Sequence, residues 1–116
     1  LRASAALALE RLLRENQSIA RAAVARRLGL SVRTLQRRLG AEGTTFRAVS
    51  DDVRRRAATT LLAASELSLA AVAQRLRFKD EAGFAKAWKR WTGTTPAAHR
   101  RVRRGEAASS PEVPTS

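Results

Sequence analysis

Several classes of side chain are scarce or absent, and each absence excludes a kind of site. The sequence contains no cysteine, which excludes disulfides and thiolate zinc sites and fits a reducing cytoplasm. Its single histidine, His99, excludes a metal site or a catalytic dyad built on a pair of histidines. No apolar run approaches the ~20 residues of a membrane span, and Leu1 begins no signal-peptide pattern. We therefore expect a cytoplasmic protein with no membrane partner.

Catalytic groupings are absent as well. Asp51 and Asp52 are adjacent, so they do not share one helix face. Asp80 stands where a helix cap is expected. The sequence shows no nucleophile–base constellation and no glycine-rich phosphate loop. It therefore predicts neither enzymatic activity nor a cofactor.

Aromatic residues are also few, at 4% against 44% hydrophobic residues. The core must then consist mostly of Leu, Val and Ala, which suits helices that approach each other closely. Proline is absent before Pro96, and no stretch alternates with period two. We predict an all-α fold of about seven helices as far as about Arg104. From Gly105 the composition shifts to Gly, Ala, Ser, Pro and Glu, so 105–116 is predicted to be a disordered tail.

Positive charge is what the sequence has in excess. Lys plus Arg number 23 and Asp plus Glu number 10, a net charge of +13. Such a charge favours a polyanionic partner, most commonly nucleic acid. An anionic membrane surface is the rival partner, although it favours bulky apolar residues that face outward. A soluble protein that uses Arg in place of Lys is the third interpretation.

Capping residues and glycines divide the chain into helices. The first expected helix runs from Ala3 to Glu15. The residues expected to cap the starts of the later helices are Ser18, Ser31, Thr44 or Thr45, Ser68, Asp80 and Thr95. Helices are expected to end at Gly29, Gly43 and Gly93. The first has its apolar side at Leu7, Leu9, Leu12 and Leu13. The longest runs from Phe46 to about Ala64, with one apolar stripe at Phe46, Val49, Val53, Ala57 and Leu61. Trp88 and Trp91 keep helical register with Phe84, which favours core positions.

An internal repeat is the most informative pattern. Residues 24–28 match residues 72–76, and residues 43–48 match residues 93–98. Each copy has a short helix, a tight turn, a capped second helix and a glycine stop, which is typical of a helix-turn-helix. The alternative is a duplicated αα-hairpin of a helical bundle. In the first copy Leu35 and Leu39 occupy the core side, which leaves Arg33, Gln36 and Arg37 opposite. These three suit guanine and adenine edges, or else form an ordinary solvated surface.

At these residues the sequence resembles the AraC/XylS family of bacterial transcription regulators. The first unit, Val24–Phe46, is similar to the family's first helix-turn-helix, and Leu69–Arg100 resembles its more distinctive C-terminal signature. The resemblance implies two homeodomain-like subdomains joined by a long linker helix. Residues 1–104 would form the DNA-binding domain, with a first unit at about 5–43, a linker at about 45–65 and a second unit at about 68–104.

The resemblance also implies a function and its partners. It predicts sequence-specific binding of double-stranded operator DNA in two adjacent major-groove segments, and regulation of transcription initiation. A linker of ~28 Å suits recognition helices about 34 Å apart on a long, non-palindromic site. RNA polymerase is a second partner that the resemblance implies. A start without Met suggests that an effector-binding or dimerisation domain precedes this segment.

The family's base-reading positions, carried over by motif, fall on Arg33, Gln36 and Arg37 in the first unit. In the second unit they fall on Glu81, Ala82, Gly83 and Lys86. Two of those have almost no side chain, and Glu81 equally suits the dipole of a first helical turn. We therefore expect most base discrimination from the first recognition helix, with docking by phosphates and shape at the second.

Phosphate contacts are expected from the residues that flank the two recognition helices, together with helix-start amides. The candidates are Ser31, Arg38, Arg47, Arg75, Arg77, Lys79, Lys89 and Arg90. In the run Arg54–Arg56 at least one side chain is expected to be merely solvated. Arg100, Arg101, Arg103 and Arg104 are either a further DNA-backbone anchor or solubilising charge.

Two residues depart from the family. Arg77 stands where glycine is usual. If this residue is left-handed, a non-glycine side chain there costs about 1 kcal/mol of stability. A contact between Arg77 and a phosphate would offset this cost. His99 replaces a tyrosine, which is expected to loosen the last helix. Two other classes of function remain open: a basic helical RNA-binding or ribosome-associated protein, which predicts exposed aromatics, and an interaction module that docks on RNA polymerase.

Overall fold

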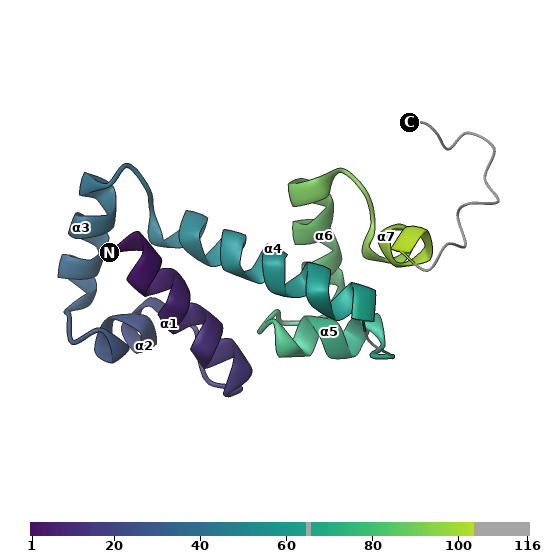
Figure 1. Ribbon diagram of the computed structural model, residues 1–116, viewed down its shortest axis with the longest axis horizontal. Helices are drawn as coiled ribbons and strands as arrows, with labels where there is room; N and C mark the ends of the chain where they lie inside the picture. Colours follow the sequence, from purple (N-terminus) through teal and green to yellow (C-terminus); the bar gives the residue numbers. More distant parts are fainter. Residues whose placement is uncertain (65, 104–116) are drawn as a thin grey trace. The chain divides into compact units, whose positions relative to one another are not determined.

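The computed structural model describes residues 1–64 and 66–103, and within them it contains seven helices and no strand (Figure 1). The helices are α1 (Arg2–Arg14), α2 (Arg21–Arg27), α3 (Val32–Ala41), α4 (Phe46–Ala64), α5 (Leu69–Arg75), α6 (Glu81–Thr92) and α7 (Pro96–Arg103). The predicted all-α class and the number of helices are confirmed. The tail predicted for 105–116 lies outside the described residues.

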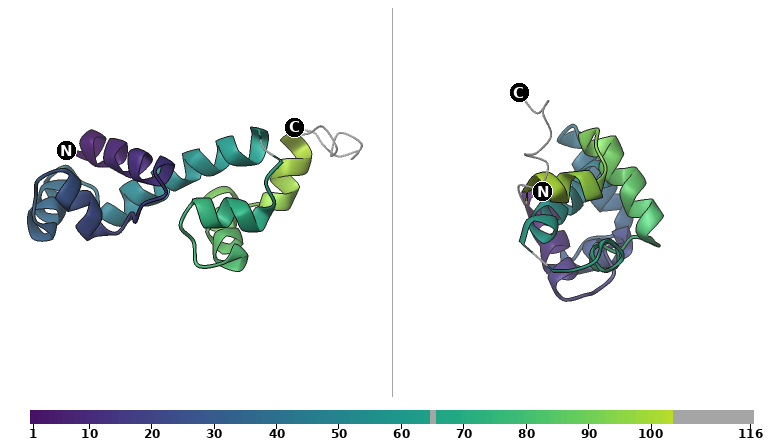
Figure 2. Two further views of the ribbon diagram at one scale, coloured as in Figure 1. Left: turned by 90° about the horizontal axis from the view of Figure 1, so that it is seen from below. Right: turned by 90° about the vertical axis from the view of Figure 1, so that its right-hand side faces the viewer.

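The chain divides into two compact units, Leu1–Ala57 and Ala58–Ser116, and the division falls inside α4. The first unit contains α1, α2, α3 and the first part of α4, with α2 packed against both α1 and α3 (Figure 2). The second contains the rest of α4 with α5, α6 and α7, and α6 packs against α5 and α7. Each unit therefore includes one short helix, one turn and one longer capped helix.

The core of the first unit is aliphatic. It comprises Ala5, Ala8, Leu9, Leu12, Val24, Ala25, Leu35, Leu39, Val49 and Val53. Leu7 was predicted to belong to the apolar side of α1 but is 46% exposed. Ala5, Leu9 and Leu12 form the buried face of α1. At 3.6 residues per turn, the position of Leu7 lies on a different side of the helix.

The core of the second unit is built around aromatic rings. Phe84 and Trp88 are almost fully buried on α6, and their centroids lie 6.2 Å apart. Trp91 is half-buried and forms an edge contact with Trp88 at 6.4 Å. The core placement predicted for Trp88 is thus confirmed. The ring of His99 packs on Trp88 in a T-shaped arrangement with centroids 5.0 Å apart; that it loosens α7 relative to a tyrosine stays a prediction.

The buried stripe of α4 differs from the prediction in its second half. Val49 and Val53 are buried as expected, but the next fully buried residues are Ala58 and Leu62 rather than Ala57 and Leu61, which are half-buried. A single stripe assumes that one set of partners covers the whole helix. Here the first half of α4 belongs to one unit and the second half to the other.

Most predicted helix caps are confirmed by hydrogen bonds. The backbone N–H groups of Thr34, Ala71 and Gly83 donate to Ser31, Ser68 and Asp80, at 3.1, 3.1 and 2.8 Å. Ala48 and Ala98 donate in the same way to Thr45 and Thr95. The prediction for Ser18 was wrong: its hydroxyl accepts from Ala20 N at 3.2 Å, and α2 begins only at Arg21. A serine bonded two residues ahead forms a local turn that competes with a helix start.

The two short helices end in the same backbone conformation. After α2, Gly29 has φ +72° and Leu30 N donates to Ala25 O at 2.8 Å. After α5, Arg77 has φ +66° and Phe78 N donates to Ala73 O at 3.0 Å. This is the Schellman ending, in which the residue after a left-handed residue donates to the carbonyl five residues before it. The predicted left-handed conformation of Arg77 is confirmed.

Replacement of two glycines by alanine tests the importance of this ending. A methyl group added at Gly29 or at Gly40 would meet no neighbouring atom within 4 Å, but only Gly29 has positive φ. Gly29→Ala should lower the free energy of unfolding by about 1 kcal/mol, because L-residues are strained there. Gly40→Ala, in the helical backbone of α3, should raise it by about 0.5–1 kcal/mol. Urea denaturation measures both, and a shift of the same sign in the two variants would contradict the role assigned to the left-handed turn.

Candidate nucleic-acid interface

The first recognition helix, α3, is held by a turn and a cap. Residues 28–31 connect it to α2, and the Ser31 hydroxyl accepts from Thr34 N while donating to Thr34 Oγ1 at 2.9 Å. The hydroxyl of Ser31 therefore has its only proton engaged within the protein. A phosphate contact through this proton would require the bond to Thr34 to break, and the predicted phosphate contact of Ser31 stays a prediction.

The three predicted base-reading residues of α3 lie together on its exposed side. Leu35 and Leu39 are completely buried, while Arg33, Gln36 and Arg37 are exposed. Burial of the two leucines fixes the rotation of α3 about its own axis. The long polar side chains consequently project away from the core of the first unit.

The second recognition helix, α6, follows the same plan with different side chains. Phe84, Ala87 and Trp88 are buried on one side. Glu81, Ala82 and Lys86 are exposed, and Gly83 is half-buried. The predicted residues are thus on the accessible side of α6, yet only Glu81 and Lys86 offer a long polar group.

Gly83 has a structural reason to be glycine. Its N–H donates to Asp80 Oδ1 at 2.8 Å, and a Cβ at this position would lie 3.3 Å from the same oxygen. The tight approach of the cap favours a residue with no side chain. Gly83 therefore serves the start of α6, and nothing in its geometry adds a group that recognises a base.

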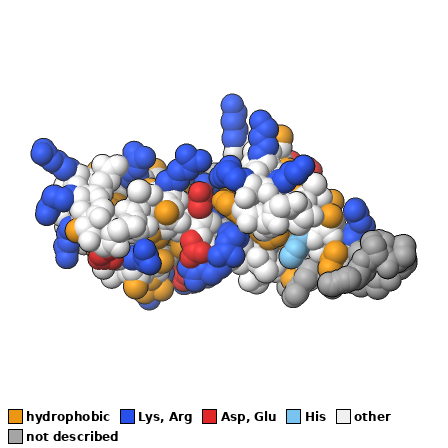
Figure 3. Space-filling view, turned by 90° about the horizontal axis from the view of Figure 1, so that it is seen from above, with side chains coloured by type: hydrophobic (Ala, Val, Ile, Leu, Met, Phe, Trp, Pro, Cys, Tyr) orange, Lys and Arg blue, Asp and Glu red, His pale blue; other side chains and the backbone are white. Residues whose placement is uncertain are grey.

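The remaining phosphate candidates are exposed on both units, where Lys and Arg side chains protrude (Figure 3). They are Arg38 and Arg47 in the first unit and Arg75, Arg77, Lys79, Lys89 and Arg90 in the second. Arg47 also lies 3.9 Å from Asp51, although its side chain remains 76% exposed. All seven are thus accessible to a polyanion.

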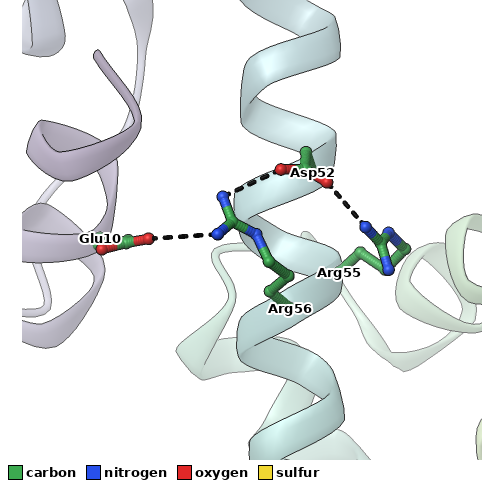
Figure 4. Close-up of polar contacts among 4 residues, drawn as sticks. All are labelled: Glu10, Asp52, Arg55 and Arg56. Carbon is green, nitrogen blue, oxygen red and sulfur yellow. Dashed lines mark hydrogen bonds and ion pairs between the residues drawn. The ribbon is translucent and has the colours of Figure 1, made fainter. Parts of the chain in front are cut away.

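The arginine run of α4 is engaged with carboxylates, contrary to prediction. Arg54 lies 3.8 Å from Asp51, and Arg55 and Arg56 lie 2.7 and 2.9 Å from Asp52. Arg56 also lies 4.0 Å from Glu10 on α1 (Figure 4). The run was expected to leave at least one arginine merely solvated, but all three lie within 4 Å of one of two acids one turn away on α4.

Hydrogen bonding within this network lowers the pKa of Asp52. The bond from Arg55 is the main cause, and the nearby charge of Arg56 acts in the same direction. A similar bond from Arg27 lowers the pKa of Glu15 and raises that of Arg27, where the end of α1 meets α2. These pairs reduce the positive charge that α4 and α2 present to a ligand.

Sequence reasoning missed the role of Arg100. Its guanidinium donates to the backbone carbonyl of Leu62, at 3.3 Å, and to that of Leu67. These carbonyls lie at the end of α4 and in the segment that follows it, so Arg100 ties α7 to that segment. A run of similar arginines gives no signal that distinguishes it. Arg101 is exposed, and the side chains of Arg103 and Arg104 lie outside the described residues.

Among the described residues, no cluster of three or more His, Cys, Asp or Glu residues is placed to hold a metal ion. No helix in this part of the chain has the length and the apolar character needed to span a membrane.

Comparisons with known proteins point to one family. The family model described as "Helix-turn-helix domain" matches residues 24–102. The ornithine utilization regulator of Pseudomonas aeruginosa is 42% identical over 76 residues, which are 66% of this chain and 22% of that protein. The chain thus spans less than a quarter of the length of this relative.

The chain also resembles solved structures. The transcriptional regulator CdpR from Pseudomonas aeruginosa superposes with a TM-score of 0.69 and 40% identity, over 75% of this chain and 28% of that one. The DNA-binding domain of AdpA, solved in complex with a target DNA, has a TM-score of 0.69 and 25% identity, over 93% of this chain and 96% of that one.

Substitution of neighbouring arginines tests the role of Arg100. Arg100→Ala should lower the free energy of unfolding by about 2 kcal/mol, since a charged donor to two backbone carbonyls is lost. Arg101→Ala removes an exposed arginine from the same helix and should change stability by less than about 0.5 kcal/mol. Equal effects in urea denaturation would show that Arg100 does not hold α7.

The Asp52 network predicts a dependence on pH. A carboxyl with a lowered pKa stabilises the fold above its unfolded pKa, and this contribution disappears as pH falls through the folded value. At neutral pH Asp52→Asn should be less stable than the parent by about 0.5 kcal/mol, because the pairs are half exposed and screened by water. The difference should shrink below about pH 4. A gap that stays constant down to about pH 3 in urea titrations would rule this out.

Proposed function

Because the chain belongs to the AraC/XylS family of helix-turn-helix DNA-binding domains, we propose that it binds operator DNA sequence-specifically and thereby regulates transcription initiation. The exposed side of α3 carries this proposal. Three polar side chains project from a helix whose opposite side is locked by Leu35 and Leu39. A helix of this kind fits the width of a major groove.

The side chains of α3 suit particular bases. The guanidinium groups of Arg33 and Arg37 donate two parallel hydrogen bonds, which match O6 and N7 of guanine. The amide of Gln36 both donates and accepts, which matches N6 and N7 of adenine. The first DNA element should therefore contain guanine and adenine at the positions that α3 faces.

The side chains of α6 support a different mode of docking. Of its exposed positions, Lys86 can reach a guanine or a phosphate, and Glu81 can accept from cytosine N4. Ala82 and Gly83 add little recognition. We expect the second unit to contribute mainly phosphate contacts from Arg75, Arg77, Lys79, Lys89 and Arg90, which supply affinity without sequence preference.

Occurrence of the same cap, turn and recognition helix in both units supports binding to two adjacent major-groove segments of one duplex. The related AdpA domain was solved with a target DNA. Burial of Phe84 and Trp88 speaks against a single-stranded RNA partner, because stacking on bases requires accessible rings.

The lengths of the relatives support a proposal that this domain is part of a larger protein. They are transcription regulators of which the chain spans about a quarter. We infer that the domain acts without catalysis, in the cytoplasm, alongside an effector-binding or dimerisation domain and with RNA polymerase as a second partner.

Selection from a randomised duplex pool at two salt concentrations, followed by sequencing, tests the function. We expect two enriched elements about ten base pairs apart. Arg37→Ala should remove preference at one position of the stronger element, at about 1–3 kcal/mol of discrimination. Lys86→Ala should weaken binding with a smaller change of preference.

Arg11→Ala serves as the control for loss of one exposed charge, since Arg11 lies on α1 outside both recognition helices. Its selected motif should match that of the parent. Binding without any enriched element would reject the base-reading role of α3, and equal losses of discrimination in Arg37→Ala and Lys86→Ala would reject the asymmetry.

A further inference from the structure

Gly40 lies on the same side of α3 as the three proposed base-reading residues. It is exposed, and at about 100° per residue it faces in nearly the same direction as Arg33, between the directions of Gln36 and Arg37. With a rise of ~1.5 Å per residue it lies roughly 10 Å beyond Arg33 along the helix axis. The surface proposed to enter the major groove therefore ends at a position that has no side chain.

The fold itself does not require glycine at this position. Gly40 belongs to the helical backbone of α3, and it is not among the glycines with positive φ, which are Gly29, Gly43 and Gly93. A Cβ added at Gly40 would meet no atom of the described residues within 4 Å. Apart from proline, glycine is the least favourable residue inside a helix. An alanine or a leucine would thus stabilise α3.

The equivalent position of the second unit carries a long side chain. Gly40 follows the cap Ser31 at the same distance along the chain as Lys89 follows the cap Asp80. Lys89 is also exposed, so this position of a recognition helix accommodates a long side chain in a unit of the same plan. A lysine in place of Gly40 would also strengthen the attraction to a polyanion. Neither the architecture nor the charge of the chain therefore explains the glycine.

The dimensions of a major groove supply an explanation. The groove is about 12 Å wide and about 8.5 Å deep, and a helix with its side chains has a diameter of about 10–12 Å. The size of the side chains that face the DNA therefore decides how far the helix enters. Glycine is the residue that allows a backbone to approach a ligand closely.

We propose that Gly40 is a positioning residue, whose missing side chain lets DNA approach the backbone of α3 and so brings Gln36 and Arg37 within hydrogen-bond reach of base edges. This inference rests on the proposed function and deepens it, because the depth of insertion determines whether the side chains of the first recognition helix reach the bases. A larger side chain at this position would hold the last turn of α3 away from the groove.

Substitution of Gly40 by leucine separates stability from recognition. Leucine is uncharged and forms no hydrogen bond with DNA, so it changes mainly the space beside α3. Gly40→Leu should melt a few degrees higher than the parent, because its helix propensity is greater. Its affinity for the duplex that the parent selects should fall roughly tenfold or more, with loss of the preference conferred by Gln36 and Arg37. The slope of log affinity against log salt should change by less than about 0.9, the value for one phosphate contact.

Two further variants control for size and for surface hydrophobicity. Gly40→Ala adds only a methyl group and should show a similar rise in melting temperature with a smaller loss of preference. Ser4→Leu places a leucine at an exposed position of α1 and should leave both the affinity and the selected sequence unchanged.

Parent-like affinity and preference in Gly40→Leu would overturn the inference, since the space beside Gly40 would then be irrelevant to recognition. A lower melting temperature in that variant would also overturn it, because glycine would then serve the fold. Failure of the parent domain to enrich any element would instead refute the proposed function.

Discussion

Burial of the apolar side of α3 is the constraint on which the recognition surface depends. Leu35 and Leu39 are one turn apart and completely inaccessible to water, and exposing either would cost about 1.5–3 kcal/mol. That penalty sets the rotation of the helix. The cap at Ser31 sets where the helix begins, so the direction of Arg33, Gln36 and Arg37 follows from contacts that these residues do not make themselves.

The two units reach one architecture with different core chemistry. The buried core cluster of the first unit is aliphatic, whereas in the second unit Trp88 packs against both Phe84 and the His99 ring. Flat rings allow neighbouring helices to meet through edge contacts. Similar turns and caps in both units are thus compatible with cores that share few residue types, which explains why the repeat in the sequence is confined to caps, turns and a few apolar positions.

Local signals in the sequence predicted much of the fold. A serine, threonine or aspartate before a helix and a glycine after it are recognisable within a few residues, and Ser31, Ser68, Asp80 and Gly93 act as expected. The prediction of a cap at Ser18 was wrong because a serine that caps a helix and a serine that bonds to the N–H two residues ahead look alike in the sequence.

Long-range contacts were beyond sequence reasoning. Arg100 looks like its neighbours until its partners, 33 and 38 residues away, are known. The arginines of α4 could have been paired with Asp51 and Asp52 from helical spacing, but the contact of Arg56 with Glu10 required the packing of α1. For the recognition surface, exposure of the predicted residues followed from periodicity, while the reason for glycine at position 83 required the distance to Asp80.

The distribution of aromatic residues has a consequence for spectroscopy. Both tryptophans of the chain, Trp88 and Trp91, belong to α6, and the sequence contains no tyrosine. Intrinsic fluorescence therefore observes the second unit and is silent for the first, whereas far-ultraviolet circular dichroism observes the helices of both. Comparing the two signals during denaturation shows whether the halves melt together, because coincident transitions are the mark of a single cooperative event.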